Sequence, residues 1–141
     1  ISPDQGLIAE IWYRPKIHRK DRTVLAKKGE FGIAVDRNGA LHAFVGGSKG
    51  VVQIDVKGLP IPENRWSKLS ILWDSKTLTL FVNDRPLARR AGKAVFEMND
   101  SPLLIGTSEM PLDGCVDEIR VDALVEDSHP VLPAAFFLLD S

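Results

Sequence analysis

Apolar and polar residues alternate along most of this chain with a period of two. In residues 7–14 (LIAEIWYR) the odd-numbered positions are apolar or aromatic, while Glu10, Trp12 and Arg14 occupy the other face. That period is typical of a β-strand with one buried face, and Pro15 ends the strand because it has no amide hydrogen to donate. Residues 7–14 are therefore predicted to form a strand.

Similar segments follow at short intervals, separated by Gly, Asn, Asp and Pro. Asp36-Arg37-Asn38-Gly39 predicts a hairpin turn, because Asn-Gly adopts positive φ at little cost. Residues 58–65 contain two prolines and predict a crossing loop. Helical spacing over three turns is found nowhere in the sequence. Further strands are predicted at 23–27, 31–36, 40–45, 51–56, 66–73, 77–82, 86–91, 102–106 and 114–122, with one more in the tail at 131–139.

Many short strands with turn signals between them predict an all-β sandwich or barrel. A chain of 141 residues has room for one such domain with a proper core. The alternation also places Trp66 and Trp73 in the core, makes Cys115 a small buried hydrophobe, and puts Asp117 beside the core with a hydrogen-bond partner. The predicted core consists of Leu7, Ala9, Ile11, Phe31, Ile33, Val35, Leu69, Ile71, Leu78, Leu80, Ile105 and Ile119.

The composition is that of an ordinary globular protein, with 44% apolar and 26% charged residues. A total of 18 basic and 19 acidic residues leaves a net charge of −1, so a nucleic-acid partner is not expected. The basic cluster between Arg14 and Arg22 is interpreted as a solvated loop. Apolar runs stay short of membrane-spanning length, so membrane insertion is not expected either. Because the sequence opens on Ile1 rather than Met, we expect it to be part of a larger multidomain protein.

Four segments carry a more specific pattern. They are 9–15 (AEIWYRP), 24–33 (VLAKKGEFGI), the stretch from Asn64-Arg65-Trp66 through Leu78-Thr79-Leu80-Phe81-Val82-Asn83, and 103–106 (LLIG) followed by 114–121 (GCVDEIRV). In this order and spacing they resemble the laminin-G-like jelly-roll domains of the concanavalin A-like lectin and glucanase superfamily. The resemblance covers about residues 7–122. It implies a single antiparallel jelly-roll sandwich for the whole chain, 1–141.

The sequence departs from that family pattern in three places. Asn83 is followed by Asp84 where the family has Gly, and Asp tolerates a left-handed turn position. The family's first strands have no counterpart at the start of this sequence. Residues 126–141 do not match the family's usual ending, and the tail 123–141 can supply the strand that the start lacks.

The resemblance implies a recognition module with a sugar-binding face. Trp12 projects from the face opposite the predicted core, where an aromatic ring can stack on a pyranose ring. An alternative is that Trp12 packs beneath the chain termini as a structural residue. The candidate ligand-binding residues are Trp12, Glu10, Arg14, His42, Phe44, Glu118 and Arg120.

Calcium is the one cofactor that the resemblance suggests, and none is required. Ca²⁺ takes hard oxygen ligands that converge from loops. The candidate metal residues are Asp74, Asp84, Asp100 and Asp113, with Asn83 and Asn99 as further donors. Each of them is also an ordinary turn residue, which is the competing interpretation.

Catalysis is disfavoured by the same residues that make the strand 114–122 resemble the family. Glucanases of the superfamily carry acidic residues at alternate positions on one strand. Here Arg120 stands between Glu118 and Asp122, and its permanent charge favours ionised carboxylates on both sides rather than a general acid. A cross-strand Glu–Arg ion pair is expected instead.

Two functional hypotheses therefore remain. The first is a non-catalytic module that recognises a glycan or a protein, within an extracellular or cell-envelope protein. The second is a structural or assembly domain without a small ligand, acting as a spacer or an oligomer interface. Fold resemblance does not decide between them, because one fold hosts many functions.

Overall fold

The computed structural model describes residues 6–16, 21–58, 61–97, 99–105 and 114–124. Within these residues there are ten strands and no helix, hence no helix that could cross a membrane. The strand predicted at 131–139 lies outside the described residues. The strands are β1 (Gly6–Pro15), β2 (Arg22–Lys27), β3 (Phe31–Val35), β4 (Leu41–Gly47), β5 (Gly50–Val56), β6 (Ser67–Trp73), β7 (Thr77–Val82), β8 (Arg85–Ala91), β9 (Leu103–Leu104) and β10 (Gly114–Leu124).

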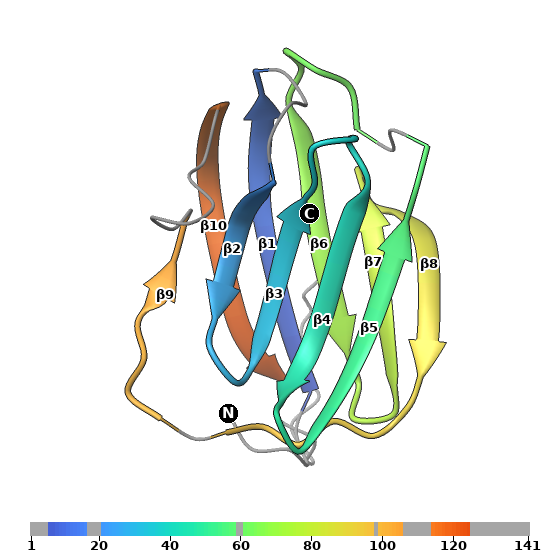
Figure 1. The fold of residues 1–141 in the computed structure, drawn as a ribbon, viewed down its shortest axis with the longest axis vertical. Coiled ribbons are helices and arrows are strands. Elements are labelled where there is room, and N and C mark those ends of the chain that lie inside the picture. Colours follow the sequence, from blue (N-terminus) through green and yellow to red (C-terminus); the bar gives the residue numbers. More distant parts are fainter. Residues whose placement is uncertain (1–5, 17–20, 59–60, 98, 106–113, 125–141) are drawn as a thin grey trace.

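The strands form two antiparallel sheets that stack face to face (Figure 1). One sheet has the order β10-β1-β6-β7-β8, and the other has the order β5-β4-β3-β2-β9. The predicted antiparallel β-sandwich is confirmed. We call the outer surface of the first sheet the β1 face and the outer surface of the second sheet the β4 face.

The core lies between the sheets and is built from the inward-pointing set of each alternating strand. Ten of the twelve predicted core residues are buried, as is Trp73, because their strands keep one phase from end to end. Ile105 is 40% exposed, since it follows the two-residue edge strand β9. Trp66 is 44% exposed and is not a core residue, because it alternates with Ser67, which is buried.

A β-bulge in β10 explains why the predicted orientations of Cys115, Asp117 and Ile119 are wrong. Glu10 pairs with Arg120 and Trp12 pairs with Asp117, so Ile11 alone opposes two residues of β10. One of those two, Glu118, has left-handed backbone with a φ of 48°. An extra residue reverses the inward and outward phase, because side chains alternate strictly.

The reversed phase turns three predicted inward residues outward at the start of β10. Cys115 and Asp117 are exposed, and Ile119 is 38% exposed. Val116 takes the inward position instead and packs against the core. Asp117 does accept a hydrogen bond from a backbone amide, that of Glu118 at 2.9 Å, but on the outer surface.

The β7–β8 turn accommodates the residue that departs from the family pattern. Asn83 and Asp84 have φ values of 53° and 67°, which is the backbone of a two-residue hairpin turn that matches strand twist. The Oδ1 atom of Asn83 accepts a hydrogen bond from the Lys68 amide at 2.8 Å. Asp84 is thereby held at the edge of the β1 face.

Candidate binding site

The sandwich separates the predicted ligand-binding residues onto two opposite surfaces. Glu10, Trp12 and Arg14 alternate with buried residues of β1 and therefore lie on the β1 face. His42 and Phe44 alternate with buried residues of β4 and lie on the β4 face. The structure does not bring these two groups together, because β1 and β4 belong to different sheets (Figure 1).

The two predicted ligand-binding residues of β10, Glu118 and Arg120, lie in different surroundings. Arg120 lies on the β1 face, where its Nη1 is 3.6 Å from Oε1 of Glu10. This is a cross-strand Glu–Arg ion pair of the kind expected. Glu118 sits in the bulge and has no register partner on β1, so it stands apart from the Arg120–Asp122 pair.

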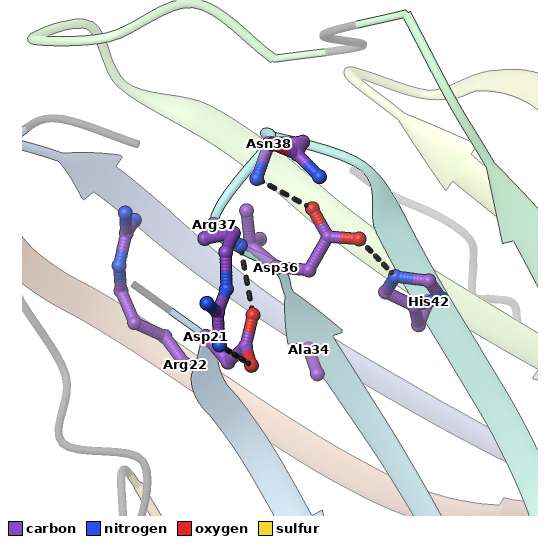
Figure 2. A pocket seen from close by; sticks show the side chains of 8 residues that line it. Asp21, Arg22, Ala34, Asp36, Arg37, Asn38 and His42 are labelled. Carbon is purple, nitrogen blue, oxygen red and sulfur yellow. Dashed lines mark hydrogen bonds and ion pairs between the residues drawn. The ribbon is translucent and has the colours of Figure 1, made fainter. Parts of the chain in front are cut away.

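A hollow of about 430 Å³ lies on the β4 side of the molecule, at the β3–β4 hairpin (Figure 2). Figure 2 shows the Asp36 carboxylate turned toward Asn38 and His42, and Asp21 turned toward Arg37. Asp36 Oδ1 accepts hydrogen bonds from the amides of Asn38 (2.8 Å) and Ala40 (3.0 Å). These are turn-forming contacts of an Asp at the start of a hairpin.

Two more side chains that line this hollow, Asp21 and His42, are also held by hydrogen bonds. Asp21 accepts hydrogen bonds from the backbone amide of Arg37 at 2.9 Å and from its guanidinium at 3.2 Å. His42 contacts Asp36 through Nε2 at 2.9 Å and Asp55 through Nδ1 at 2.6 Å. These contacts brace the β3–β4 hairpin.

Electrostatics in this cluster follow from the same contacts. Burial lowers the pKa of His42, but hydrogen bonds to Asp55 and then Asp36 outweigh burial and raise the pKa. Burial raises the pKa of Asp36, and the hydrogen bonds from His42 and two backbone amides more than offset it, so the pKa is lowered. The hydrogen bond from His42 also lowers the pKa of Asp55.

A different pocket, of about 210 Å³, lies on the β1 face. Its lining comes from β1, β6, β7 and the β7–β8 turn, and consists of Ile8, Glu10, Ser70, Ile71, Leu72, Phe81 and Asp84. The strand registers explain the shape. Arg120, Glu10, Ser70 and Phe81 are consecutive neighbours in one row across four strands. The smallest side chain of that row is Ser70, so the row dips there and a pocket forms.

The Ser70 side chain lies at the floor of this pocket. The residue is only 5% exposed, and its Oγ has no hydrogen-bond partner among the described residues. A buried polar atom without a partner costs about 1–3 kcal/mol. The hydroxyl oxygen itself has less than 1 Å² of accessible area, so a ligand in the pocket reaches it only after the Ser70 side chain rotates toward the pocket.

Charged groups surround the pocket in opposite pairs. Asp84 lies 2.6 Å from Lys68, and Glu10 lies 3.6 Å from Arg120. Arg120 also contacts Asp122 at 2.5 Å. The rim therefore offers donors and acceptors whose positions are already fixed by ion pairs.

Sequence reasoning found Glu10 and Arg120 but missed Ser70, Leu72 and Phe81 as ligand-binding candidates. The signal was present, because Ser70 alternates with the buried Leu69 and Ile71, and Phe81 follows the buried Leu80. What the sequence lacked was the strand order, which places β6 and β7 beside β1 on one sheet.

The predicted metal residues do not converge. Asp74 precedes β7 and accepts hydrogen bonds from the amides of Lys76 (2.9 Å) and Thr77 (2.7 Å), whereas Asp84 follows β7 and pairs with Lys68. Asp100 is exposed, and Asp113 lies outside the described residues. Within the described ranges, no cluster of three or more His, Cys, Asp or Glu residues could hold a metal ion. Calcium binding stays an expectation of the family resemblance.

The two stacked antiparallel sheets define a lectin-like β-sandwich domain. The family model of the Concanavalin A-like lectin/glucanases superfamily matches residues 3–127. The chain belongs to this superfamily. No curated protein matches the chain.

Solved structures with the same fold include carbohydrate-binding and protein-binding domains. The carbohydrate-binding module CBM40 of the Ruminococcus gnavus IT-sialidase, bound to α2,3-sialyllactose, has a TM-score of 0.68 at 15% identity, over 89% of this chain and 80% of that one. A protein of Bacteroides ovatus described as carbohydrate-binding has a TM-score of 0.66 at 20% identity, over 84% of this chain and 37% of that one. The binding domain of botulinum neurotoxin DC, in complex with rat synaptotagmin II, has a TM-score of 0.61 at 11% identity, over 84% of this chain and 32% of that one.

Proposed function

We propose that this domain is a non-catalytic carbohydrate-binding module whose ligand occupies the β1-face pocket. The observation that carries the proposal is the lining of that pocket, where the polar side chains of Ser70, Glu10 and Asp84 stand beside apolar ones. Small-ligand sites are concave and largely apolar, with a few well-placed polar groups that fix the ligand.

The lining of this pocket has the mixture that a sugar ring requires. Phe81, Leu72 and Ile8 supply apolar surface for the C–H groups of a pyranose ring. Ser70 and the carboxylates of Glu10 and Asp84 supply hydrogen-bonding groups for its hydroxyls. The solved CBM40 structures, which share this fold, support a glycan as the ligand class.

A binding role is favoured over hydrolysis because each carboxylate at the pocket faces a cation. Glu10 pairs with Arg120 and Asp84 pairs with Lys68. Glycoside hydrolysis needs one carboxyl group that stays protonated until it donates to the leaving group. Both carboxylates at this pocket are engaged in ion pairs instead, so neither is free to serve as that donor. We further propose that the domain serves a larger extracellular or cell-envelope protein, as is common for modules of this superfamily.

A glycan array with and without Ca²⁺, followed by calorimetric titration of the glycans that bind, tests the proposal. Ser70→Ala is expected to weaken binding roughly tenfold, because a hydrogen bond to the ligand is lost. Ser67→Ala is the matched control, since Ser67 lies on the same strand, is buried and has no hydroxyl partner among the described residues, but faces the core. Equal effects of the two variants would contradict the proposed site.

Phe81, the aromatic residue of the pocket lining, offers a second matched pair of variants. Phe81→Ala is expected to reduce binding by more than tenfold, whereas Phe44→Ala, on the β4 face, should leave it unchanged. If every printed glycan fails to bind and the purified domain self-associates instead, the structural or assembly hypothesis replaces this one.

A further inference from the structure

The β1 face carries a cation–π pair beyond the pocket, formed by Arg14 and Trp66. The guanidinium carbon of Arg14 lies 5.7 Å from the centroid of the Trp66 ring, within the range of a cation–π contact. Trp66 is nevertheless 44% exposed. An exposed tryptophan held in place by a partner costs little conformational entropy when it binds a ligand.

The pair lies on the same surface as the pocket. Ser67 is fully buried and pairs with the inward Tyr13, so its neighbours Trp66 and Lys68 point outward, as Arg14 does. Arg14 has no carboxylate partner among the described residues; its Nη2 lies 3.6 Å from the Cys115 sulfur. Its remaining N–H groups are therefore available to oxygen atoms of a ligand.

A continuous track joins the pocket to this pair. Ser70 and Trp66 are separated by four residues, which corresponds to about 13 Å along an antiparallel strand. Trp12 and Lys68, which are neighbours in register, fill the row between them. A distance of that size exceeds one sugar ring, so a single ring in the pocket cannot reach Trp66.

We infer that Trp66 and Arg14 form a second sugar subsite and that the ligand is an oligosaccharide chain laid along β1 and β6. One sugar ring occupies the pocket at Ser70 and Phe81, the chain crosses Trp12, and a later ring stacks on Trp66 while Arg14 donates to its oxygens. This inference rests on the proposed function, because it extends the same face. The cation–π pair, in which Trp66 stays 44% exposed, is the observation that adds the second subsite.

The test uses an array of linear glucan, xylan, mannan, galactan and N-acetyllactosamine series, each printed from one to six units, probed with the intact chain. Binding is expected to rise with length, and Trp66→Ala should lose roughly tenfold in affinity for the tetrasaccharide but nothing for the monosaccharide. Trp66→Phe, which keeps an aromatic ring, should retain most of the gain. Val51→Ala is the control, since Val51 is 52% exposed on the other sheet.

A direct readout comes from the indole N–H signal of Trp66 in nuclear magnetic resonance, assigned by its loss in Trp66→Phe. That signal should shift with the bound tetrasaccharide and stay in place with the monosaccharide. Binding that does not depend on length, or that is unchanged in Trp66→Ala, overturns the second subsite and leaves the pocket intact. Absence of binding both to every series and to every glycan of the wider array overturns the proposed function itself, and the subsite with it.

Discussion

The Nδ1 atom of His42 lies 2.6 Å from Oδ1 of Asp55, its neighbour across the β4–β5 ladder. The other ring nitrogen lies 2.9 Å from Oδ2 of Asp36. A neutral imidazole donates from one nitrogen only, whereas the imidazolium donates from both. The geometry therefore favours the protonated ring, in agreement with the raised pKa of His42.

The raised pKa of His42 predicts a pH-dependent stability. Because the folded-state pKa lies above the usual 6.5, the contribution of His42 is fully present below pH 6.5 and is lost as the pH rises through the raised value. The lowered pKa values of Asp36 and Asp55 add stability above pH 3.8 that is lost as the pH falls through the lowered values. Between those limits the cluster stabilises the fold most, by about 1 kcal/mol or less, because its groups are partly exposed.

Urea unfolding at pH 5.5 and pH 8.5, with the wild type and His42→Gln, measures this contribution. The difference between the two proteins isolates His42 from His18 and His129, which lie outside the described residues. The wild type should lose more stability than the variant between the two pH values. An equal loss in both proteins would show that His42 is not linked to folding.

A buried hydrogen bond in the core predicts a larger effect. Tyr13 and Arg22 are both fully buried, and the Tyr13 hydroxyl accepts a hydrogen bond from Nη1 of Arg22 at 3.0 Å. Tyr13→Phe removes that acceptor from a buried cation and should lower the free energy of unfolding by about 1–3 kcal/mol. Chemical denaturation checks the value. Ser67→Ala, which removes a buried hydroxyl without a partner among the described residues, should cost far less.

Close packing on the β4 face predicts a coupled pair of substitutions. Gly32 lies opposite Phe44, and a Cβ atom at Gly32 would stand 2.3 Å from Cε2 of the Phe44 ring. Gly32→Ala should therefore cost about 1–3 kcal/mol through overpacking. In the Phe44→Ala background the same substitution should cost much less, and a double-mutant cycle measures the difference. Additive losses would mean that the ring moves away without strain.

Much of the fold could be predicted because the sequence of a half-buried strand indicates which of its faces is buried. Leu7, Ala9 and Ile11 are buried as predicted, since one uninterrupted alternation leaves a single choice of inward face. The bulge in β10 has no comparable signal in the sequence. Glu118 carries left-handed backbone without being Gly or Asn, so nothing in its residue type announced the shift that turned Cys115, Asp117 and Ile119 outward.

Only part of the candidate site could be predicted from the sequence, for a different reason. Alternation tells which residues point outward, and it did so for Glu10, Trp12 and His42. It does not tell which outward surfaces coincide, because that depends on how the strands are ordered in two sheets. Ser70 shows the same limit, since a small outward residue forms a pocket only when larger neighbours flank it across the sheet.

The last prediction concerns catalysis: the purified domain should hydrolyse no β-glucan, galactan or sialoside at any pH from acidic to neutral. Glu118 stands in the bulge, apart from Asp122, and Arg120 contacts both Asp122 and Glu10. Because Arg120 forms ion pairs with both of these carboxylates, they do not face each other across a substrate as the paired carboxyl groups of a glycosidase do. Sensitive reducing-sugar and fluorogenic assays across pH 4–7 check this expectation. Turnover that disappears in Glu118→Gln or Glu10→Gln, with binding retained, would make the domain an enzyme and refute a purely binding role.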